Sequence, residues 1–218
     1  MFNTTLFSSR NVAEATRVVA VLVFVTQTFS VHAAVIDPQL TISVRAYTAF
    51  DRTEVDFPAA RGQVESAFRS TGIAVEWLDC HGTPAPAHCQ SPPQADEMVV
   101  RIVTAAESSK GAFVPLGVSL VDPRTRTGCY ATVYIDRVLA LAKRLDITAG
   151  PVLGRAIAHE IGHLLLGTTR HTETGLMRKI WSPTELQRND ADDWIFLRKE
   201  AAAIREAVTT RLARRAQP

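Results

Sequence analysis

The stretch Ala156-Ile157-Ala158-His159-Glu160-Ile161-Gly162-His163-Leu164-Leu165-Leu166-Gly167 determines how this 218-residue chain is interpreted. His159 and His163 are four residues apart, so an α-helix places both imidazoles on one face, where they can point at one metal ion. Small and apolar residues surround the two histidines, and Gly167 is a typical helix stop because glycine accepts the left-handed conformation. The sequence therefore predicts a helix that carries two metal ligands.

Glu160 directly follows the first histidine and can reach a metal-bound water without occupying a coordination position. This is the H-E-x-x-H pattern of zinc hydrolases. Zinc lowers the pKa of its bound water to about 7, and the glutamate takes the proton as general base. In the structural alternative the histidines pack inside a helix and Glu160 faces solvent. That alternative leaves two ionisable rings and a carboxylate among leucines without a partner, which is costly.

From His159 to Trp181 the sequence resembles the metzincin clan of zinc endopeptidases. The long motif of that clan is H-E-x-x-H-x-x-G-x-x-H, followed by a methionine-containing turn under the metal. This chain has one extra residue before Gly167 and another between Gly167 and His171, and Gly175-Leu176-Met177 is similar to the methionine turn. The resemblance implies a zinc metallopeptidase in which His171 is the third ligand and Met177 forms a hydrophobic floor.

Three residues are candidates for the third zinc ligand. A glycine-containing turn after the helix can return His171 to the metal. Glu185 lies at a distance suited to the gluzincin arrangement, in which a second helix supplies a glutamate. It also follows Ser182-Pro183-Thr184 at a helix start, where a carboxylate complements the helix dipole. Glu173 is also near. We favour His171 and expect one Zn²⁺ as the cofactor.

The N-terminus has the features of a secretory signal sequence. Arg10 and Arg17 precede the apolar run Val18–Val25, and Val31-His32-Ala33-Ala34 is small at the positions that a signal peptidase reads. We expect cleavage after Ala33, which leaves one zincin-like metallopeptidase domain, secreted or periplasmic, over the remainder of the chain to residue 218. The apolar run is short for a membrane span, although an uncleaved anchor is the alternative.

The cysteines agree with export. Cys80 and Cys89 bracket a proline-rich loop and are expected to form a disulfide in an oxidising compartment. The alternative is a metal site made of these two cysteines with His81 and His88, although the spacing is not that of a compact zinc knuckle. Cys129 is the odd thiol and is expected to be buried and inert.

The remaining pattern predicts an α+β, zincin-like fold with a mixed five-stranded sheet, an active-site helix and C-terminal helices. Strands are predicted at residues 40–47, 73–78, 98–103, 117–121 and 130–135. Helices are predicted at residues 58–70, 137–145 and 148–166, from Pro183 and at 201–213. Prolines flank the 117–121 strand, which suits a sheet edge. The resemblance implies that this edge binds an extended substrate, the alternative being an ordinary edge strand.

Composition restricts the partners. Lys and Arg number 24 against 22 Asp and Glu, so nothing indicates binding to nucleic acid or to an anionic membrane surface. The basic residues from Arg205 to Arg215 are interpreted as a solvated helix face. We expect a monomer that acts on a peptide or protein, without a stable membrane span after signal cleavage. The alternatives are an inactive exported metal-binding or scaffold module, a hydrolase of non-peptide amides, and a gluzincin-type hydrolase that uses Glu185.

Overall fold

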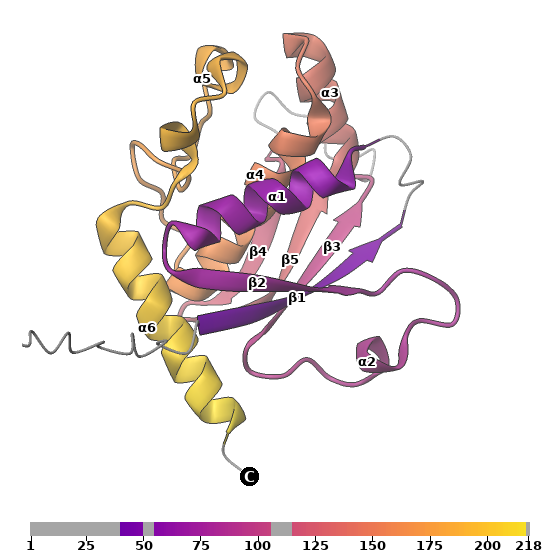
Figure 1. Cartoon of the computed structure of the whole chain (residues 1–218), viewed down its shortest axis with the longest axis vertical. Helices are drawn as coiled ribbons and strands as arrows, with labels where there is room; N and C mark the ends of the chain where they lie inside the picture. Colours follow the sequence, from indigo (N-terminus) through magenta and orange to yellow (C-terminus); the bar gives the residue numbers. More distant parts are fainter. Residues whose placement is uncertain (1–39, 50–54, 106–114, 217–218) are drawn as a thin grey trace, which may run out of the picture. The chain divides into compact units, whose positions relative to one another are not determined.

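A computed structural model describes residues 40–49, 55–105 and 115–216 of the chain (Figure 1). The expected signal sequence, residues 1–33, lies outside these described residues. The strands are β1 (Leu40–Thr48), β2 (Ile73–Asp79), β3 (Glu97–Val103), β4 (Gly117–Asp122) and β5 (Thr127–Tyr134). The helices are α1 (Phe57–Arg69), α2 (Ala87–Gln90), α3 (Ile135–Leu145), α4 (Ala149–Leu166), α5 (Pro183–Arg188), the 3-10 helix η3 (Ala191–Trp194) and α6 (Arg198–Arg215).

The five strands form one mixed sheet in the order β2-β1-β3-β5-β4. β1 pairs in parallel with β2 and β3, and β3 pairs in parallel with β5, whereas β4 is antiparallel to β5. The strand flanked by prolines, β4, is therefore at the edge of the sheet, as predicted. Prolines are tolerated there because an unpaired edge needs no N–H for the ladder. The expected α+β class, with its mixed five-stranded sheet and C-terminal helices, is confirmed, and α4 forms where the active-site helix was predicted.

Helix α4 packs closely against α1 and the sheet (Figure 1). Two glycines of α4 allow this approach. A Cβ atom at Gly154 would lie 2.3 Å from the carbonyl oxygen of Ala60 in α1, and one at Gly150 would lie 2.7 Å from that of Asp56. The sequence thus places residues without side chains where α1 crosses, and α4 is buried along nearly its whole length.

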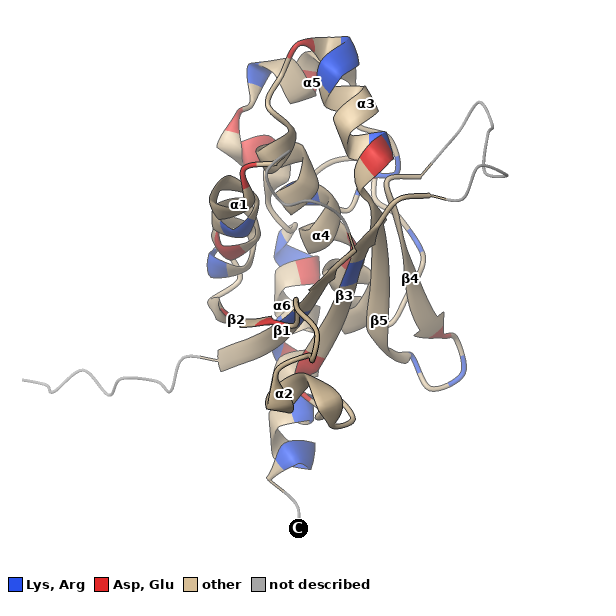
Figure 2. Cartoon of the chain, turned by 90° about the vertical axis from the view of Figure 1, so that its right-hand side faces the viewer, with Lys and Arg blue, Asp and Glu red and all other residues tan. Residues whose placement is uncertain are grey.

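Three arginines attach α6 to the domain, so the basic C-terminal segment is only partly the solvated face that we expected. Arg205 donates to the carbonyl of Thr71 at 3.0 Å, and Arg215 pairs with Asp96 at 2.6 Å. Arg211 donates to three carbonyl oxygens, those of Ala95 at 3.0 Å, Gly128 at 2.8 Å and Leu164 at 3.2 Å. Charges of both signs are mixed along α6 and α1 (Figure 2).

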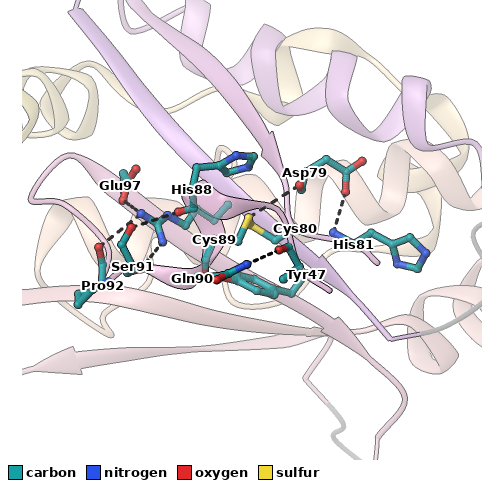
Figure 3. The surroundings of a disulfide bond; sticks show 12 residues. Tyr47, Asp79, Cys80, His81, His88, Cys89, Gln90, Ser91, Pro92 and Glu97 are labelled. Atoms are coloured by element: carbon teal, nitrogen blue, oxygen red, sulfur yellow. Dashed lines mark hydrogen bonds and ion pairs between the residues drawn. A yellow bond between two sulfur atoms is a disulfide. The ribbon is translucent and has the colours of Figure 1, made fainter. Parts of the chain in front are cut away.

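The disulfide Cys80–Cys89 is present, with the two Cα atoms 5.7 Å apart (Figure 3). It ties α2, which lies within the predicted loop, to the end of β2. The hydroxyl of Tyr47 donates to the carbonyl of Cys89 at 3.0 Å and holds the loop on β1. Because metal ligation needs a thiolate, sulfur atoms bonded to each other are not available for the alternative metal site. His81 instead bonds Thr48 Oγ1 at 3.1 Å.

The structure includes Cys129 in a strand, although the predicted strand begins only at residue 130. This cysteine lies within β5, which begins at Thr127, and it is half-buried rather than fully buried. Burial raises the pKa of its thiol, and the charge of Arg211 opposes this shift. Among the described residues, no helix is both long and apolar enough to cross a membrane.

Candidate metal centre

Helix α4 positions His159, Glu160 and His163, which are all buried. The helix ends at Gly167, whose φ is +61° and whose N–H bonds the carbonyl of His163. A Cβ atom at Gly167 would lie 2.2 Å from the carbonyl oxygen of Arg126. Both the left-handed backbone and the close approach of the β4–β5 turn therefore require glycine at this position.

The Nδ1 atoms of the two helical histidines bond backbone carbonyls that lie beyond the helix. His159 Nδ1 is 2.9 Å from the oxygen of Leu176, and His163 Nδ1 is 2.8 Å from that of Thr168. A carbonyl oxygen only accepts, so each Nδ1 carries a proton. In the neutral ring the other nitrogen, Nε2, then has a free lone pair, which is the state that a metal requires.

His171 returns to the helix after the turn. Its Nε2 lies 3.3 Å from Nε2 of His163, which in turn is 3.1 Å from Nε2 of His159. The three nitrogens lie within 4.8 Å of one another. His171 is the most exposed of the three, so the cluster opens to solvent on its side.

This histidine cluster, His159, His163 and His171, fits a zinc ion. With protons on their Nδ1 atoms, the neutral rings of His159 and His163 bring two lone pairs within 3.1 Å and form no hydrogen bond between them. A cation removes that repulsion. Nitrogens bound tetrahedrally at zinc's usual distance of about 2.0–2.1 Å are about 3.3–3.4 Å apart, close to the separations found here.

Burial keeps these rings neutral. It lowers the pKa of His159 and that of His163 to about 4, against the hydrogen bonds that the rings donate to backbone carbonyls, which raise both values. The pKa of His171 is also lowered, by burial first and then by the charge of Lys179. At neutral pH the cluster therefore needs to lose no proton before it binds a metal.

Glu160 is buried, and its carboxylate faces the edge strand β4 rather than solvent. Burial raises its pKa to about 7, and a hydrogen bond from Ser119 lowers it. A carboxylate whose pKa is near the working pH suits a general base. The sequence interpretation missed Ser119, because a serine between the apolar residues Val118 and Leu120 would be expected to face solvent, whereas the structure exposes these two neighbours instead.

Met177 is buried and packs on the motif helix at Gly162, the residue before His163. A Cβ atom at Gly162 would lie 2.6 Å from Met177 Sδ, so the absent side chain provides the space that the methionine fills. The turn around it is closed by Thr172, whose N–H bonds the carbonyl of Met177 at 3.1 Å. Leu176, the partner of His159, is itself held by a bond from its N–H to the carbonyl of Ile195 at 2.8 Å.

The rival third ligands lie outside the cluster: among the described residues its converging groups include neither Glu173 nor Glu185. The Glu185 carboxylate is engaged at the start of α5, where Oε2 accepts from the N–H of Ser182 at 2.8 Å and from its hydroxyl at 2.7 Å. Its Oε1 is 3.5 Å from Arg178. The hydrogen bonds from Ser182 lower the pKa of Glu185.

No protein-family model matches this sequence, and no curated protein matches it. Among solved structures, the crystal structure of archaemetzincin (amzA) from Methanopyrus kandleri is similar to this chain, with a TM-score of 0.48 and 14% sequence identity. The similar region covers 80% of this chain and 99% of that one. So distant a likeness does not bear on activity, which has to be derived from the side chains of the site.

Proposed function

We propose that this protein is an exported zinc-dependent metallopeptidase. The observation that carries this proposal is the convergence of three imidazole Nε2 atoms, two of them with their Nδ1 protons fixed on backbone carbonyls, beside the buried carboxylate of the next residue in the helix. His159, His163 and His171 would hold the ion. When bound, zinc supplies a Lewis acid that polarises a scissile carbonyl and activates water.

Glu160 is the proposed general base. Its carboxylate takes a proton from the attacking water and delivers it to the leaving amine, so one group serves both steps of the hydrolysis. A pKa near 7, which follows from its burial, is compatible with both roles at neutral pH. Glu185 is less suited to be the third ligand because Ser182 and Arg178 already engage both its oxygens.

A peptide is the proposed substrate. Among the described strands, β4 pairs with β5 alone, and Val118 and Leu120 on β4 are 38% and 67% exposed. An extended peptide can add to such an edge by main-chain hydrogen bonds, with its side chains on alternating faces. The strand also contacts Glu160 through Ser119, which supports peptide binding beside the base. The disulfide supports a secreted or periplasmic location.

The test is degradation of fluorescently labelled casein by the zinc-loaded protein, wild type beside Glu160→Gln. We expect wild-type turnover and a fall in kcat of about 10²–10⁴-fold in the variant, the usual contribution of a general base. Glu206→Gln, an exposed glutamate on α6, is the matched control and should retain full activity. Zinc binding without any casein cleavage in the wild type would favour the alternative of an inactive metal-binding module.

A further inference from the structure

We propose that Ser119 is a positioning residue that holds the Glu160 carboxylate in the orientation needed for proton transfer. This inference rests on the proposed function, in which Glu160 is the base. It assigns a role in the reaction to the edge strand β4 in addition to binding substrate. Ser119 lies 41 residues before Glu160, so the contact depends entirely on how β4 packs against α4.

The Ser119 hydroxyl contacts both the backbone and the side chain of Glu160. Its Oγ lies 2.8 Å from the backbone carbonyl oxygen of Glu160 and in closer contact with the carboxylate Oε2. The carboxylate is thereby fixed relative to its own backbone. Within the described residues, the Ser119 hydroxyl is the one hydrogen-bond partner of the Glu160 carboxylate.

One hydroxyl can serve both forms of a base. It has one proton to donate and two lone pairs to accept with. It donates to Oε2 when the carboxylate is deprotonated. When Glu160 carries the proton, the hydroxyl accepts from it and donates to the backbone carbonyl instead. The contact between Ser119 and Glu160 therefore survives proton transfer, and the side chain does not need to find its orientation again.

Gly117 provides the space on the same face of β4. A Cβ atom there would lie 2.7 Å from Cγ and 2.8 Å from Oε1 of Glu160. Gly117 and Ser119 are two residues apart in a strand, so they face the same side. The first leaves room for the glutamate and the second bonds it. A glutamate side chain has several rotatable bonds, and without these two constraints its carboxylate would sample several orientations.

The main experiment measures casein cleavage by zinc-loaded Ser119→Ala, Ser119→Thr and Ser119→Val. Thr and Val have similar shape and both suit a strand, but only Thr keeps the hydroxyl. We expect Ala and Val to lower kcat about 10–100-fold, the usual effect of removing a partner that orients an active-site group, with KM and zinc content changed less than about twofold. Thr should recover most of kcat.

Ser43→Ala is the matched control. Ser43 is a buried strand serine that donates to a different carboxylate, that of Glu76, at 3.4 Å, and its removal should leave kcat unchanged. A second comparison uses the Glu160→Gln background. Two residues that act as one unit are not additive, so Ser119→Ala should cause little further loss there. A full additional loss in that background, or equal activity of the Thr and Val variants, would overturn the proposal.

Crystal structures of the zinc-loaded wild type and Ser119→Ala separate this proposal from the proposed function. If the wild type cleaves no casein, the peptidase assignment fails. The position of the Glu160 side chain in the two structures still tests whether Ser119 holds it. We expect it to leave its place in Ser119→Ala. An unchanged, fully ordered carboxylate in the variant would overturn the role of Ser119 even if the protein proves to be an active peptidase.

Discussion

The carbonyl oxygen of Leu176 accepts a hydrogen bond from Nδ1 of His159 at 2.9 Å. This contact joins the residue before Met177 to the first histidine of the motif helix. The turn therefore orients a ring whose free nitrogen points into the histidine cluster, while Met177 fills the space beside Gly162. A single short segment thus orients one candidate metal ligand and packs Met177 against the motif helix.

The first prediction concerns zinc content. Wild-type protein should bind one zinc ion, and His171→Ala should lose at least about tenfold in affinity because the ion keeps only two protein ligands. Glu185→Ala is the matched comparison, since its carboxylate caps α5 and it should keep its zinc. Metal analysis after dialysis against a weak chelator measures both. Retention by His171→Ala together with loss by Glu185→Ala would move the third ligand to the glutamate.

The second prediction concerns the pH dependence of the metal-free protein. Burial lowers the pKa of His159 and of His163 from 6.5 to about 4. Between these values the unfolded chain binds protons that the folded protein does not, so the free energy of unfolding should fall as pH falls from about 6.5 to 4. Each histidine contributes at most about 1.4 kcal/mol per pH unit. His171 shifts in the same direction.

Glu160 opposes this trend, which provides an internal check. Burial raises its pKa from 4.5 to about 7, so in that window the folded state binds the extra proton and gains stability as pH falls. Glu160→Gln removes this contribution and should show the steeper loss of stability with acid. Urea unfolding at several pH values measures the slopes, with Glu206→Gln as control. Equal slopes for wild type and Glu160→Gln would contradict the assigned environment of the carboxylate.

The motif helix and the sheet could be predicted from the sequence because their signals are local. The four-residue spacing of His159 and His163 places both side chains on one face of a helix, and Gly167 predicts where that helix ends. The position of Glu185 at the start of a helix could likewise be predicted from the serine and proline before it. The contact between Ser119 and Glu160 could not be predicted, because no local pattern specifies which edge-strand residue meets a helix 41 residues later.

The same reason explains the other differences. Arg211 reads as a solvated charge in the sequence, yet it donates to carbonyls from three separate segments of the chain. Cys129 lies within a strand whose start is specified by pairing with β4 rather than by its own composition. Tertiary pairing decides these positions, and it is not encoded in the spacing of neighbouring residues.

The third prediction compares two glycines. Gly162→Ala places a methyl group 2.6 Å from Met177 Sδ and 2.8 Å from Phe196 Cε1, so these side chains must shift. We expect a loss of about 1–3 kcal/mol in the free energy of unfolding, the usual cost of overpacking, and weaker zinc binding. Gly62→Ala is the control, because nothing lies within 4 Å of its new Cβ and alanine favours the helix. If both variants gain stability, Met177 does not pack on Gly162 as described.

The last prediction concerns Trp194, which is almost fully buried and has two arginines against its ring. The guanidinium carbon of Arg155 lies 3.9 Å from the ring centre and that of Arg178 lies 4.6 Å from it. Both guanidinium groups thus contact one ring, and burial followed by the charge of Arg178 lowers the pKa of Arg155 to about 10. Arg155 belongs to α4 and Arg178 directly follows Met177, so Trp194 connects α4 with the turn that contains Met177.

Substitutions at Trp194 can separate the aromatic face from simple filling of space. Within the described residues its Nε1 has no hydrogen-bond partner, so Trp194→Phe loses area but no hydrogen bond. Trp194→Leu loses the aromatic face as well and leaves both guanidinium groups without it. We expect a loss of about 3–5 kcal/mol for Leu, in the range of large core truncations, and a clearly smaller loss for Phe. Urea unfolding measures both variants. Equal losses would mean that the tryptophan only fills space, and that the two arginines are stabilised by their polar partners Asn189 and Glu185 instead.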